Sequence, residues 1–249
     1  MLQRRVVVSG GGTGIGLATA HRFAADGDRV VLLGRREDVL RKAAEELNDA
    51  HGESTAGWYA ADLSDPEQAG GAVEFITEDE TPLGVLVANA GGNVAPSRDG
   101  SLAAIADSYR RNFDANVLTA VLLTEALLPH MRRPGGRIIQ LSSIASLRGA
   151  GSYGGSKGWI NSYTYDLAQR LGPEGITANA VAPGFVADTE FFGDRATPDF
   201  VASRVAQSLT GRAGLPSEIA AAVHYVASPE AAYMTGQLLH INGGAALGR

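Results

Sequence analysis

The sequence predicts an α/β protein in which helices cover both faces of one doubly wound parallel sheet, folded as a single domain over residues 1–249. Three observations lead to this prediction. Short apolar runs alternate with longer segments of helical periodicity, the apolar runs lack regular polar alternation, and no repeat, low-complexity tract or linker divides the chain. Strands and helices in steady succession build right-handed βαβ units, which place helices on both faces of a sheet.

The predicted strands are short and rich in Val, Ile and Leu. Such runs are typical of parallel strands that are buried on both faces. They cover residues 4–10, 29–34, 57–61, 84–90, 136–143, 176–184 and 237–243.

The predicted helices lie between these strands. Apolar residues in 37–50 recur at positions 39, 40, 43, 44 and 47, on one face of a helix. Pro66 directly after Asp65 is the pattern of an N-cap and a first turn. We expect helices over residues 14–26, 37–50, 66–78, about 102–132, 152–171 and 216–227.

One segment, residues 185–214, departs from this rhythm. It follows a strand and mixes Phe185, Phe191, Phe192 and Phe200 with Thr, Asp, Gly and Pro. Ligands of doubly wound sheets bind beyond the carboxyl ends of the strands. We therefore expect a substrate lid here, and the phenylalanines suit an apolar pocket. The alternative is an ordinary surface loop with one helix, in which the aromatic residues serve only for packing.

Composition and charge narrow the classes of function. Apolar residues make up 45% of the chain and charged residues 19%, which is ordinary for a soluble globular protein. The formal net charge of -6 argues against a nucleic-acid partner. Without cysteine, disulfides, thiolate nucleophiles and cysteine metal sites are excluded. No apolar stretch is long enough to span a bilayer, and the N-terminus reads as a strand and not as a signal peptide, so we expect a cytoplasmic protein without a membrane partner.

A glycine-rich turn, SGGGTGIG at residues 9–16, joins the first predicted strand to the first predicted helix. Its spacing is G-x-x-x-G-x-G, with Gly10, Gly14 and Gly16. Glycine at such a junction lets the backbone turn tightly and approach a pyrophosphate, whose charge then meets a helix N-terminus. The turn therefore predicts dinucleotide binding, and with it a Rossmann-type sheet.

The end of the second predicted strand indicates which dinucleotide is bound. An acidic residue there would hydrogen-bond the ribose 2′-hydroxyl of NAD, but this chain has Gly34, Arg35 and Arg36. Two guanidinium groups can pair with a 2′-phosphate, and no carboxylate stands there to repel it. We expect NADP(H) to be preferred, with NAD(H) possible. Solvated charges at the entry to a helix are the alternative.

Tyr153 and Lys157 are four residues apart in SYGGSKG, and on a helix they would share one face. A lone YxxxK match is common. Here it stands in order with GxxxGxG, with ANAG at 88–91, with a serine before the tyrosine and with Pro-Gly after a strand. On these motifs the chain from Val6 to Gly244 resembles the short-chain dehydrogenase/reductase family, in particular its 3-oxoacyl-carrier-protein reductase-like branch.

The resemblance implies a catalytic set of Ser143, Tyr153, Lys157 and Asn116. Ser142 and Asn112 are the nearby competitors for two of these roles, and the interval from Ser143 to Tyr153 is shorter than in many relatives. No metal is implied, and the histidines match no motif of the family.

The resemblance also implies which residues hold the cofactor. Asp62 would contact the adenine, the NAG motif would steady the sheet beside the cofactor, and the segment from Pro183 would line the nicotinamide carboxamide and phosphates. Asn242 stands where Asp is frequent, a change that we expect to be structural. The full set is Gly10, Gly12, Thr13, Gly14, Ile15, Gly16, Arg35, Arg36, Asp62, Leu63, Asn89, Ala90, Gly91, Tyr153, Lys157, Pro183, Gly184, Val186 and Thr189.

The implied chemistry is hydride transfer between nicotinamide and a carbonyl or secondary alcohol. A free tyrosine, with a pKa of about 10, exchanges protons poorly near neutrality. We expect the ammonium of Lys157 and the helix N-terminus to lower the pKa of Tyr153. Ser143 would hydrogen-bond the substrate oxygen, and Asn116 would hold a water that links Lys157 to solvent.

The substrate and the assembly follow less directly. A 3-oxoacyl thioester on an acidic carrier protein is one expectation, which Arg132 and Arg133 favour and which Glu174 and the net charge oppose. A small ketone, steroid, sugar or polyketide-like substrate is the alternative, and a non-catalytic dinucleotide sensor is a further one. The resemblance implies a homotetramer built through the helices near 102–132 and 152–171 and the C-terminal strand.

Overall fold

The computed structural model describes residues 3–78, 81–94, 100–187 and 189–247, and within them seven parallel strands form one sheet. The strand order is β3-β2-β1-β4-β5-β6-β7, so the direction of winding reverses between β1 and β4, where doubly wound sheets bind ligands. The predicted fold class is confirmed. The strands are β1 (Arg5–Ser9), β2 (Arg29–Gly34), β3 (Ala56–Ala60), β4 (Leu83–Ala88), β5 (Arg137–Leu141), β6 (Thr177–Pro183) and β7 (Leu238–Ile241).

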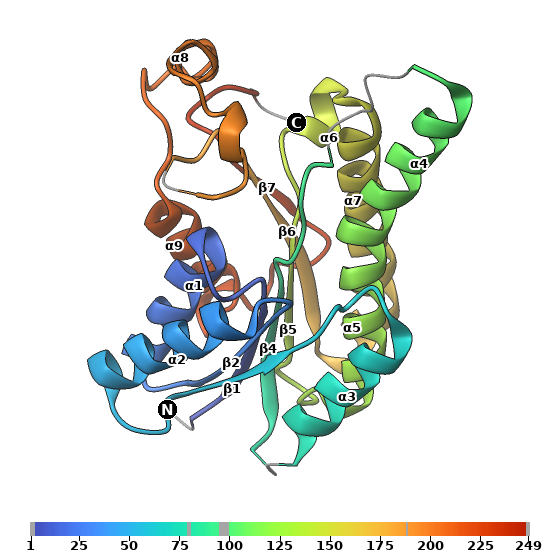
Figure 1. Cartoon of the computed structure of the whole chain (residues 1–249). Coiled ribbons are helices and arrows are strands. Elements are labelled where there is room, and N and C mark those ends of the chain that lie inside the picture. Colours follow the sequence, from blue (N-terminus) through green and yellow to red (C-terminus); the bar gives the residue numbers. More distant parts are fainter. Residues whose placement is uncertain (1–2, 79–80, 95–99, 188, 248–249) are drawn as a thin grey trace.

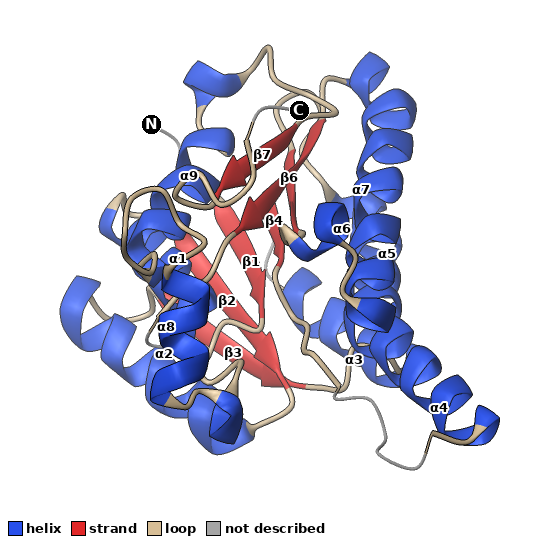
Figure 2. Ribbon diagram, turned by 90° about the horizontal axis from the view of Figure 1, so that it is seen from above, coloured by secondary structure: helices blue, strands red, loops and turns tan. Residues whose placement is uncertain are grey.

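Helices cover both faces of the sheet, as Figures 1 and 2 show. One layer holds α1 (Gly14–Ala25), α2 (Glu37–His51) and α9 (Pro216–Val226). The other layer holds α3 (Pro66–Thr77), α4 (Leu102–Phe113), α5 (Thr119–Leu127) and α7 (Gly151–Leu171).

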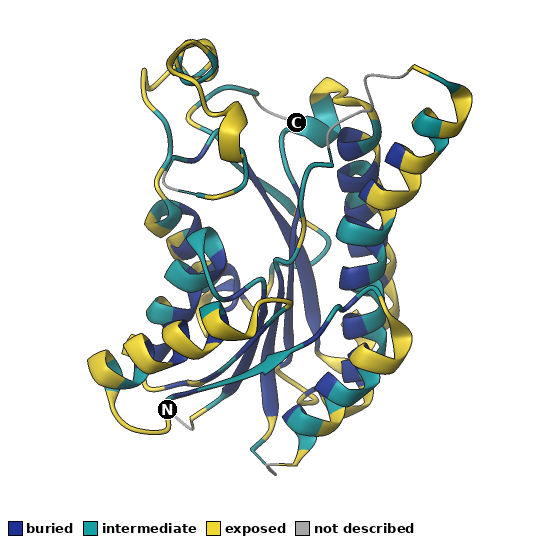
Figure 3. Cartoon of the chain, viewed as in Figure 1, coloured by how far each residue is buried: buried dark blue, intermediate teal, exposed yellow. Residues whose placement is uncertain are grey.

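Two apolar clusters fill the space between the sheet and these layers. Side chains of β1 alternate between the clusters: Val6 and Val8 pack with α1, α2 and α9, and Val7 packs with α3, α5 and α7. Successive side chains of a strand point to opposite faces, so a strand covered on both sides must be apolar throughout. The central strands are accordingly buried along their whole length, as the dark blue arrows of Figure 3 show.

Local signals set the beginnings of two helices. The Asp65 carboxylate accepts a hydrogen bond from the Gln68 amide (2.9 Å), and Pro66 occupies the first turn of α3, as the sequence predicts. At the start of α9 the Glu218 carboxylate accepts from the Leu215 amide (2.8 Å), which satisfies a backbone donor that the helix itself leaves unpaired.

The expectation of one helix near 102–132 is wrong in its interior. The chain forms α4, then a π-helical turn (Asp114–Leu118), then α5 and a final 3-10 turn (Leu128–His130). The π-helical turn widens the backbone for one turn, and such turns are frequent at functional sites. This one holds Asn116.

The segment 185–214 lies above the carboxyl end of the sheet, in orange in Figure 1. Its two ends are tied together, because the Gly214 amide donates to the Phe185 carbonyl (2.9 Å) and the Ala187 amide donates to the Gly214 carbonyl (2.9 Å). Between these ends the segment carries the exposed helix α8 (Pro198–Val205). One further short helix, α6 (Ala145–Arg148), follows β5.

Two features, a membrane-spanning helix and a metal site, are absent from the part of the chain that the structure describes. None of its helices combines the length and the apolar character needed to cross a bilayer. No cluster of three or more His, Asp or Glu side chains there is arranged to hold a metal ion.

Candidate active site

A cleft of about 1060 Å³ opens along the carboxyl edge of the sheet. Its walls come from the loops that follow β1 to β7, from the segment 185–214 and from the helical turns around Asp114. Each residue that the sequence assigns to catalysis or cofactor binding lines this cleft, except Gly16 and Asn116, which are buried beside it. The fold therefore brings together residues that are spread over most of the chain.

The glycine-rich turn forms part of the cleft wall. Gly10 (φ +65°) and Gly14 (φ +54°) adopt left-handed backbone conformations that glycine tolerates best. A Cβ on Gly16 would lie 2.0 Å from the Gly10 carbonyl oxygen, so only glycine lets α1 begin this close to the turn. Within the part of the chain that the structure describes, the side chain of the N-cap residue Thr13 accepts no hydrogen bond from the first amides of α1. These amides are therefore available to bind an anion.

Asn89, at the end of β4, braces this turn. Its Nδ2 donates to the carbonyls of Ser9 (3.0 Å) and Gly10 (3.1 Å). The amides of Asn89 and Ala90 both donate to the Ser9 hydroxyl (3.0 and 2.9 Å). The ends of two neighbouring strands are thereby held together at the point where the strand order reverses.

Both arginines after β2 line the cleft, and each is associated with a carboxylate. The Ser64 hydroxyl donates to Asp62 (2.6 Å), and this bond, together with the charge of Arg35, holds the pKa of Asp62 below its usual value. Arg36 Nη2 donates to Glu190 Oε2 (2.6 Å), in the segment 185–214. The sequence indicated that no carboxylate would stand beside the arginines. The fold brings one from a distant part of the chain.

Tyr153 and Lys157 lie on the first turns of α7 and face the cleft. The Tyr153 hydroxyl is hydrogen-bonded to Ser143. Lys157 Nζ donates to the Leu141 carbonyl (2.8 Å) and lies 6.0 Å from the centre of the Tyr153 ring. Ser142, the competing serine, is buried with its hydroxyl directed toward α7. Of the two serines, the structure places Ser143 beside the tyrosine.

Burial dominates the protonation of the tyrosine and the lysine. It raises the pKa of Tyr153 to about 12, although the hydrogen bond with Ser143 acts in the opposite direction. Burial also lowers the pKa of Lys157 to about 8. The expectation that Lys157 and the helix would lower the pKa of Tyr153 is wrong for this structure, because loss of solvation disfavours the charged form of each group.

Asn116 binds the loop after β4. Its Nδ2 donates to the carbonyls of Gly92 (2.8 Å) and Asn112 (2.9 Å), and its Oδ1 accepts from the Gly92 amide (3.2 Å). A Cβ on Gly91 would lie 2.6 Å from Asn116 Oδ1 and 3.3 Å from Lys157 Nζ. The space beside the Gly91 Cα is thus bordered by both side chains. The role of Asn116 as a water carrier stays a prediction.

Asn112, the competing asparagine, is buried and has its polar atoms bonded away from the catalytic side chains. Its Nδ2 lies within donating distance of the Val94 carbonyl (2.9 Å), the Ser108 carbonyl (3.1 Å) and the Ser152 hydroxyl (2.9 Å), and its Oδ1 accepts from the Val94 amide (3.1 Å). Asn112 therefore ties the loop after β4 to α4 and α7.

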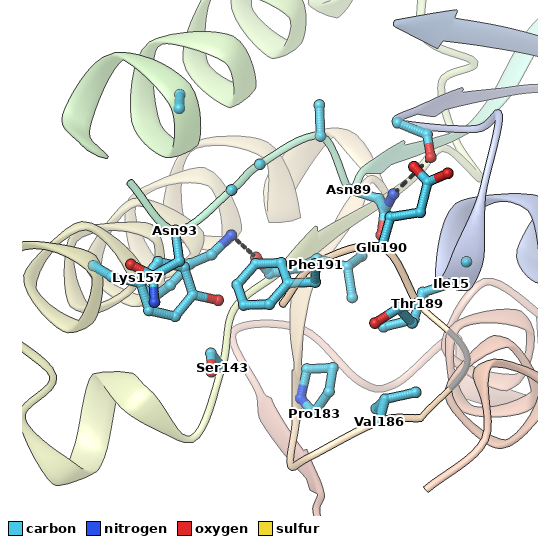
Figure 4. Close-up of a pocket in the computed structure, with 18 of the residues that line it drawn as sticks. Ile15, Asn89, Asn93, Ser143, Lys157, Pro183, Val186, Thr189, Glu190 and Phe191 are labelled. Carbon is cyan, nitrogen blue, oxygen red and sulfur yellow. Dashed lines mark hydrogen bonds between the residues drawn. The ribbon is translucent and has the colours of Figure 1, made fainter. Parts of the chain in front are cut away.

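Aromatic side chains from the segment 185–214 cover the catalytic end of the cleft. The Phe191 ring lies 5.5 Å from the Tyr153 ring, centre to centre. In Figure 4 Phe191 points into the cleft, with Lys157 and Ser143 on one side and Thr189 and Glu190 on the other. It continues a cluster of rings formed by Phe185, Phe192 and Phe200.

Comparison with known proteins identifies the family. The family described as Enoyl-(Acyl carrier protein) reductase matches residues 10–246. The chain is 39% identical to the Short-chain reductase protein NovJ of Streptomyces niveus, over 96% of this chain and 92% of that protein. It is 33% identical to the 3-oxoacyl-[acyl-carrier-protein] reductase FabG of Vibrio cholerae, over 96% and 95% of the two chains.

The chain belongs to the short-chain dehydrogenase/reductase family. Its structure agrees with that of a short chain dehydrogenase from Burkholderia cenocepacia J2315, crystallised in complex with NADP. The TM-score is 0.87 at 32% sequence identity, and the match covers 98% of each chain. This short-chain dehydrogenase/reductase is an NAD(P)-dependent oxidoreductase that acts on small molecules.

Several residues that line this short-chain dehydrogenase/reductase cleft could not be predicted from the sequence motifs. The sequence motifs do not include Glu190, and they indicate Phe191 only as an apolar residue of the expected lid; Asn93, Arg148 and Gln207 also line the cleft. None belongs to a motif, and their positions depend on how the segment 185–214, the loop after β4 and the short helix α6 after β5 fold back. The aromatic content of the expected lid was the one signal that pointed toward Phe191.

Proposed function

We propose that this enzyme transfers hydride between NADP(H) and a carbonyl or secondary alcohol, with Tyr153 as the proton donor in reduction. One observation carries the proposal. The Tyr153 hydroxyl is hydrogen-bonded to Ser143 inside the same cleft that holds the glycine-rich turn. Carbonyl reduction by a nicotinamide needs a proton donor and a dinucleotide-binding turn in one place.

The residues of the cleft fit an NADP molecule. The left-handed glycines and the uncapped amides of α1 suit a pyrophosphate, and Arg35 and Arg36 suit a 2′-phosphate. Asp62 would contact the adenine, and the residues from Pro183 to Thr189 would line the nicotinamide end. When bound, the nicotinamide supplies or accepts the hydride. The NADP in the Burkholderia structure supports a preference for NADP(H), with NAD(H) as the weaker cofactor.

Tyr153 is suited to donate a proton. A pKa of about 12 keeps the phenol protonated at neutral pH, and an alkoxide is a strong enough base to take that proton. Ser143 would hydrogen-bond the substrate oxygen as negative charge builds on it. The Lys157 ammonium would stabilise the phenolate once the proton has left, and Asn116 would hold the loop that packs beside this lysine.

We assign the segment 185–214 the role of a substrate lid. Its ends meet at the pairing of Val186 with Gly214, so that it forms a closed loop. Phe191 rests on the Tyr153 ring, in the space that a substrate carbonyl must share with the phenol. A lid that carries an aromatic ring to this position would exclude water from the reacting atoms.

Two substrate classes deserve testing. The name of the Vibrio relative supports a 3-oxoacyl thioester. However, Arg132 and Arg133 precede β5, at the opposite end of that strand from the cleft, and Arg133 is ion-paired with Glu174. These arginines offer little to an acidic carrier beside this cleft. The aromatic lid favours the second class, a small apolar ketone or a steroid, sugar or polyketide-like carbonyl compound.

The experiment is NADPH oxidation by the purified protein against acetoacetyl-CoA and a panel of ketones, with Tyr153→Phe as the control. We expect turnover of at least one carbonyl compound, and its loss in Tyr153→Phe while NADPH still binds. Lack of turnover with every 3-oxoacyl thioester would remove the first substrate class. Tight NADPH binding without turnover of any carbonyl would favour a dinucleotide sensor.

We propose a homotetramer built through α4, α7 and the region of the C-terminal strand. Apolar side chains form an exposed stripe on α4 and α7: Leu102, Ile105, Tyr109, Phe113 and Trp159. Their spacing on α4 places them along one helical face, and a contiguous exposed apolar surface is typical of a protein interface. Light scattering at micromolar concentration should give four times the mass of one chain, and a monomer would contradict the proposal.

A further inference from the structure

The lid meets the cofactor end of the cleft through two adjacent residues. Thr189 Cγ2 lies 3.3 Å from the position that a Cβ on Gly14 would take, so Thr189 sits directly over the glycine-rich turn. The next residue, Glu190, reaches the arginine that follows β2. Figure 4 shows Thr189 and Glu190 projecting from the lid on this side of the cleft. The lid therefore touches the surfaces that a dinucleotide would occupy.

The contact of Glu190 with Arg36 is an ion pair between two exposed side chains. The distance from Arg36 Nη2 to Glu190 Oε2 is 2.6 Å, and the side chains are 55% and 62% exposed. Ion pairs in water are weak and exchange easily for another partner. A phosphate group carries more charge than a carboxylate and offers more oxygen acceptors to a guanidinium. A phosphate can therefore replace Glu190 as the ion-pair partner of Arg36.

We propose that Glu190 competes with the 2′-phosphate of NADP(H) for Arg36 and so limits the preference of the enzyme for NADP(H) over NAD(H). The inference rests on the proposed role of Arg36 in binding that phosphate. NAD(H) carries a hydroxyl at the same position and leaves the ion pair intact. NADP(H) must separate the carboxylate from Arg36, and the free carboxylate then stands beside a group of like charge. Glu190 is thus a specificity-determining residue that the lid contributes.

Arg35 differs from Arg36 in this respect. The acid that acts on it, Asp62, is already held by the amide (3.0 Å) and hydroxyl (2.6 Å) of Ser64. The association of Arg35 with Asp62 involves no part of the lid. Arg36 is the guanidinium whose release requires a movement at the lid, so the effect of Glu190 should be expressed through Arg36.

The test measures dissociation constants by calorimetry for NADPH and NADH. Two fragments, adenosine 2′,5′-bisphosphate and adenosine 5′-monophosphate, separate the 2′-phosphate from the rest of the cofactor. The proteins are the wild type, Glu190→Gln, Arg36→Gln and the double variant. Asp194→Asn is the matched control, because Asp194 is an exposed acid of the same lid outside this ion pair.

We expect Glu190→Gln to tighten binding of NADPH and of the bisphosphate by about two- to fivefold, the range that an exposed ion pair contributes. Binding of NADH and of the monophosphate should stay within about twofold. In the Arg36→Gln background, Glu190→Gln should no longer change the ratio of the two cofactor affinities. Asp194→Asn should leave that ratio at its wild-type value.

Equal tightening for both cofactors, or an equal effect of Asp194→Asn, would show a general effect of charge and overturn the inference. No change in Glu190→Gln would overturn it as well. The failure of the underlying proposal looks different. In that case the wild type binds NADPH no more tightly than NADH, and Arg36→Gln leaves their ratio unchanged.

Discussion

The Lys157 ammonium donates a hydrogen bond to the carbonyl of Leu141, the last residue of β5, at 2.8 Å. One side chain thereby fastens the beginning of α7 to the strand end that leads to Ser143. Tyr153, one turn earlier on α7, is held opposite Ser143 as a consequence. The lysine therefore positions the tyrosine as well as placing a charge near it.

The two adjacent serines after β5 should respond differently to substitution. Ser143→Ala removes the hydroxyl that bonds Tyr153 and would bond the substrate oxygen, so we expect kcat to fall by about 10²- to 10³-fold. Ser142 is buried and its hydroxyl donates to Asn161 Oδ1 (2.5 Å). Ser142→Ala should lower the midpoint of thermal unfolding and keep most of kcat. Steady-state kinetics and thermal unfolding of both variants distinguish the pair, and equal loss of kcat in both would refute the assignment.

Lys157 should make the stability of the enzyme depend on pH. Its pKa is about 8 in the folded state against 10.5 for a lysine in water, so the unfolded state binds more protons between these values. The contribution of this group to the free energy of unfolding therefore rises as the pH increases from about 8 to 10.5. Lys157→Met removes the buried charge, and its stability relative to the wild type should be greatest at neutral pH and should decline as the pH approaches 10.

Urea unfolding of both proteins across pH 7 to about 9.5 measures this difference below the titration of Tyr153. Lys42, exposed on α2, provides the control variant Lys42→Met. A difference between Lys157→Met and the wild type that is the same at every pH would show that burial does not perturb this lysine.

Asn112 should matter for stability and not for the chemical step. Replacing it by Ala leaves the Val94 amide and the Ser152 hydroxyl, both in half-buried residues, without this partner, and a polar group left unsatisfied away from water costs about 1–3 kcal/mol. We expect the free energy of unfolding to fall by that amount in urea, with kcat per folded enzyme changed less than in Asn116→Ala. A larger kcat effect at Asn112 than at Asn116 would reverse the assignment of the two asparagines.

The sheet and the glycine-rich turn could be predicted because their signals are local. A strand buried on both faces is apolar throughout, and the backbone of Gly10 and Gly14 needs a residue without a side chain. The π-helical turn could not be predicted from the sequence, because it changes one hydrogen-bonding step inside a continuous helical pattern.

The candidate site likewise contains residues that a local motif predicts and contacts that only the tertiary fold creates. Ser143, Tyr153 and Lys157 stand in a short, ordered motif, and the structure brings them together. The contact between Arg36 and Glu190 joins residues 154 positions apart, and no sequence motif near either residue predicts this contact. The direction of the pKa shift of Tyr153 also depends on tertiary packing, because burial of the phenol outweighs the opposing effect of its hydrogen bond with Ser143.

Gly16 offers the sharpest test of the glycine-rich turn. A Cβ there would lie 2.0 Å from the Gly10 carbonyl oxygen and 2.7 Å from Asn89 Nδ2, both parts of the turn itself. Gly16→Ala must push the start of α1 away, so we expect NADPH to bind at least tenfold more weakly, a loss of about 1.4 kcal/mol. The control is Gly70→Ala inside α3, where an added Cβ meets no atom within 4 Å apart from its chain neighbours and the backbone of α3 itself. Because alanine favours a helix over glycine, Gly70→Ala should stabilise the fold by about 0.5–1 kcal/mol and leave binding unchanged. If Gly16→Ala bound NADPH with the same affinity as the control variant, the turn could not be the pyrophosphate-binding site.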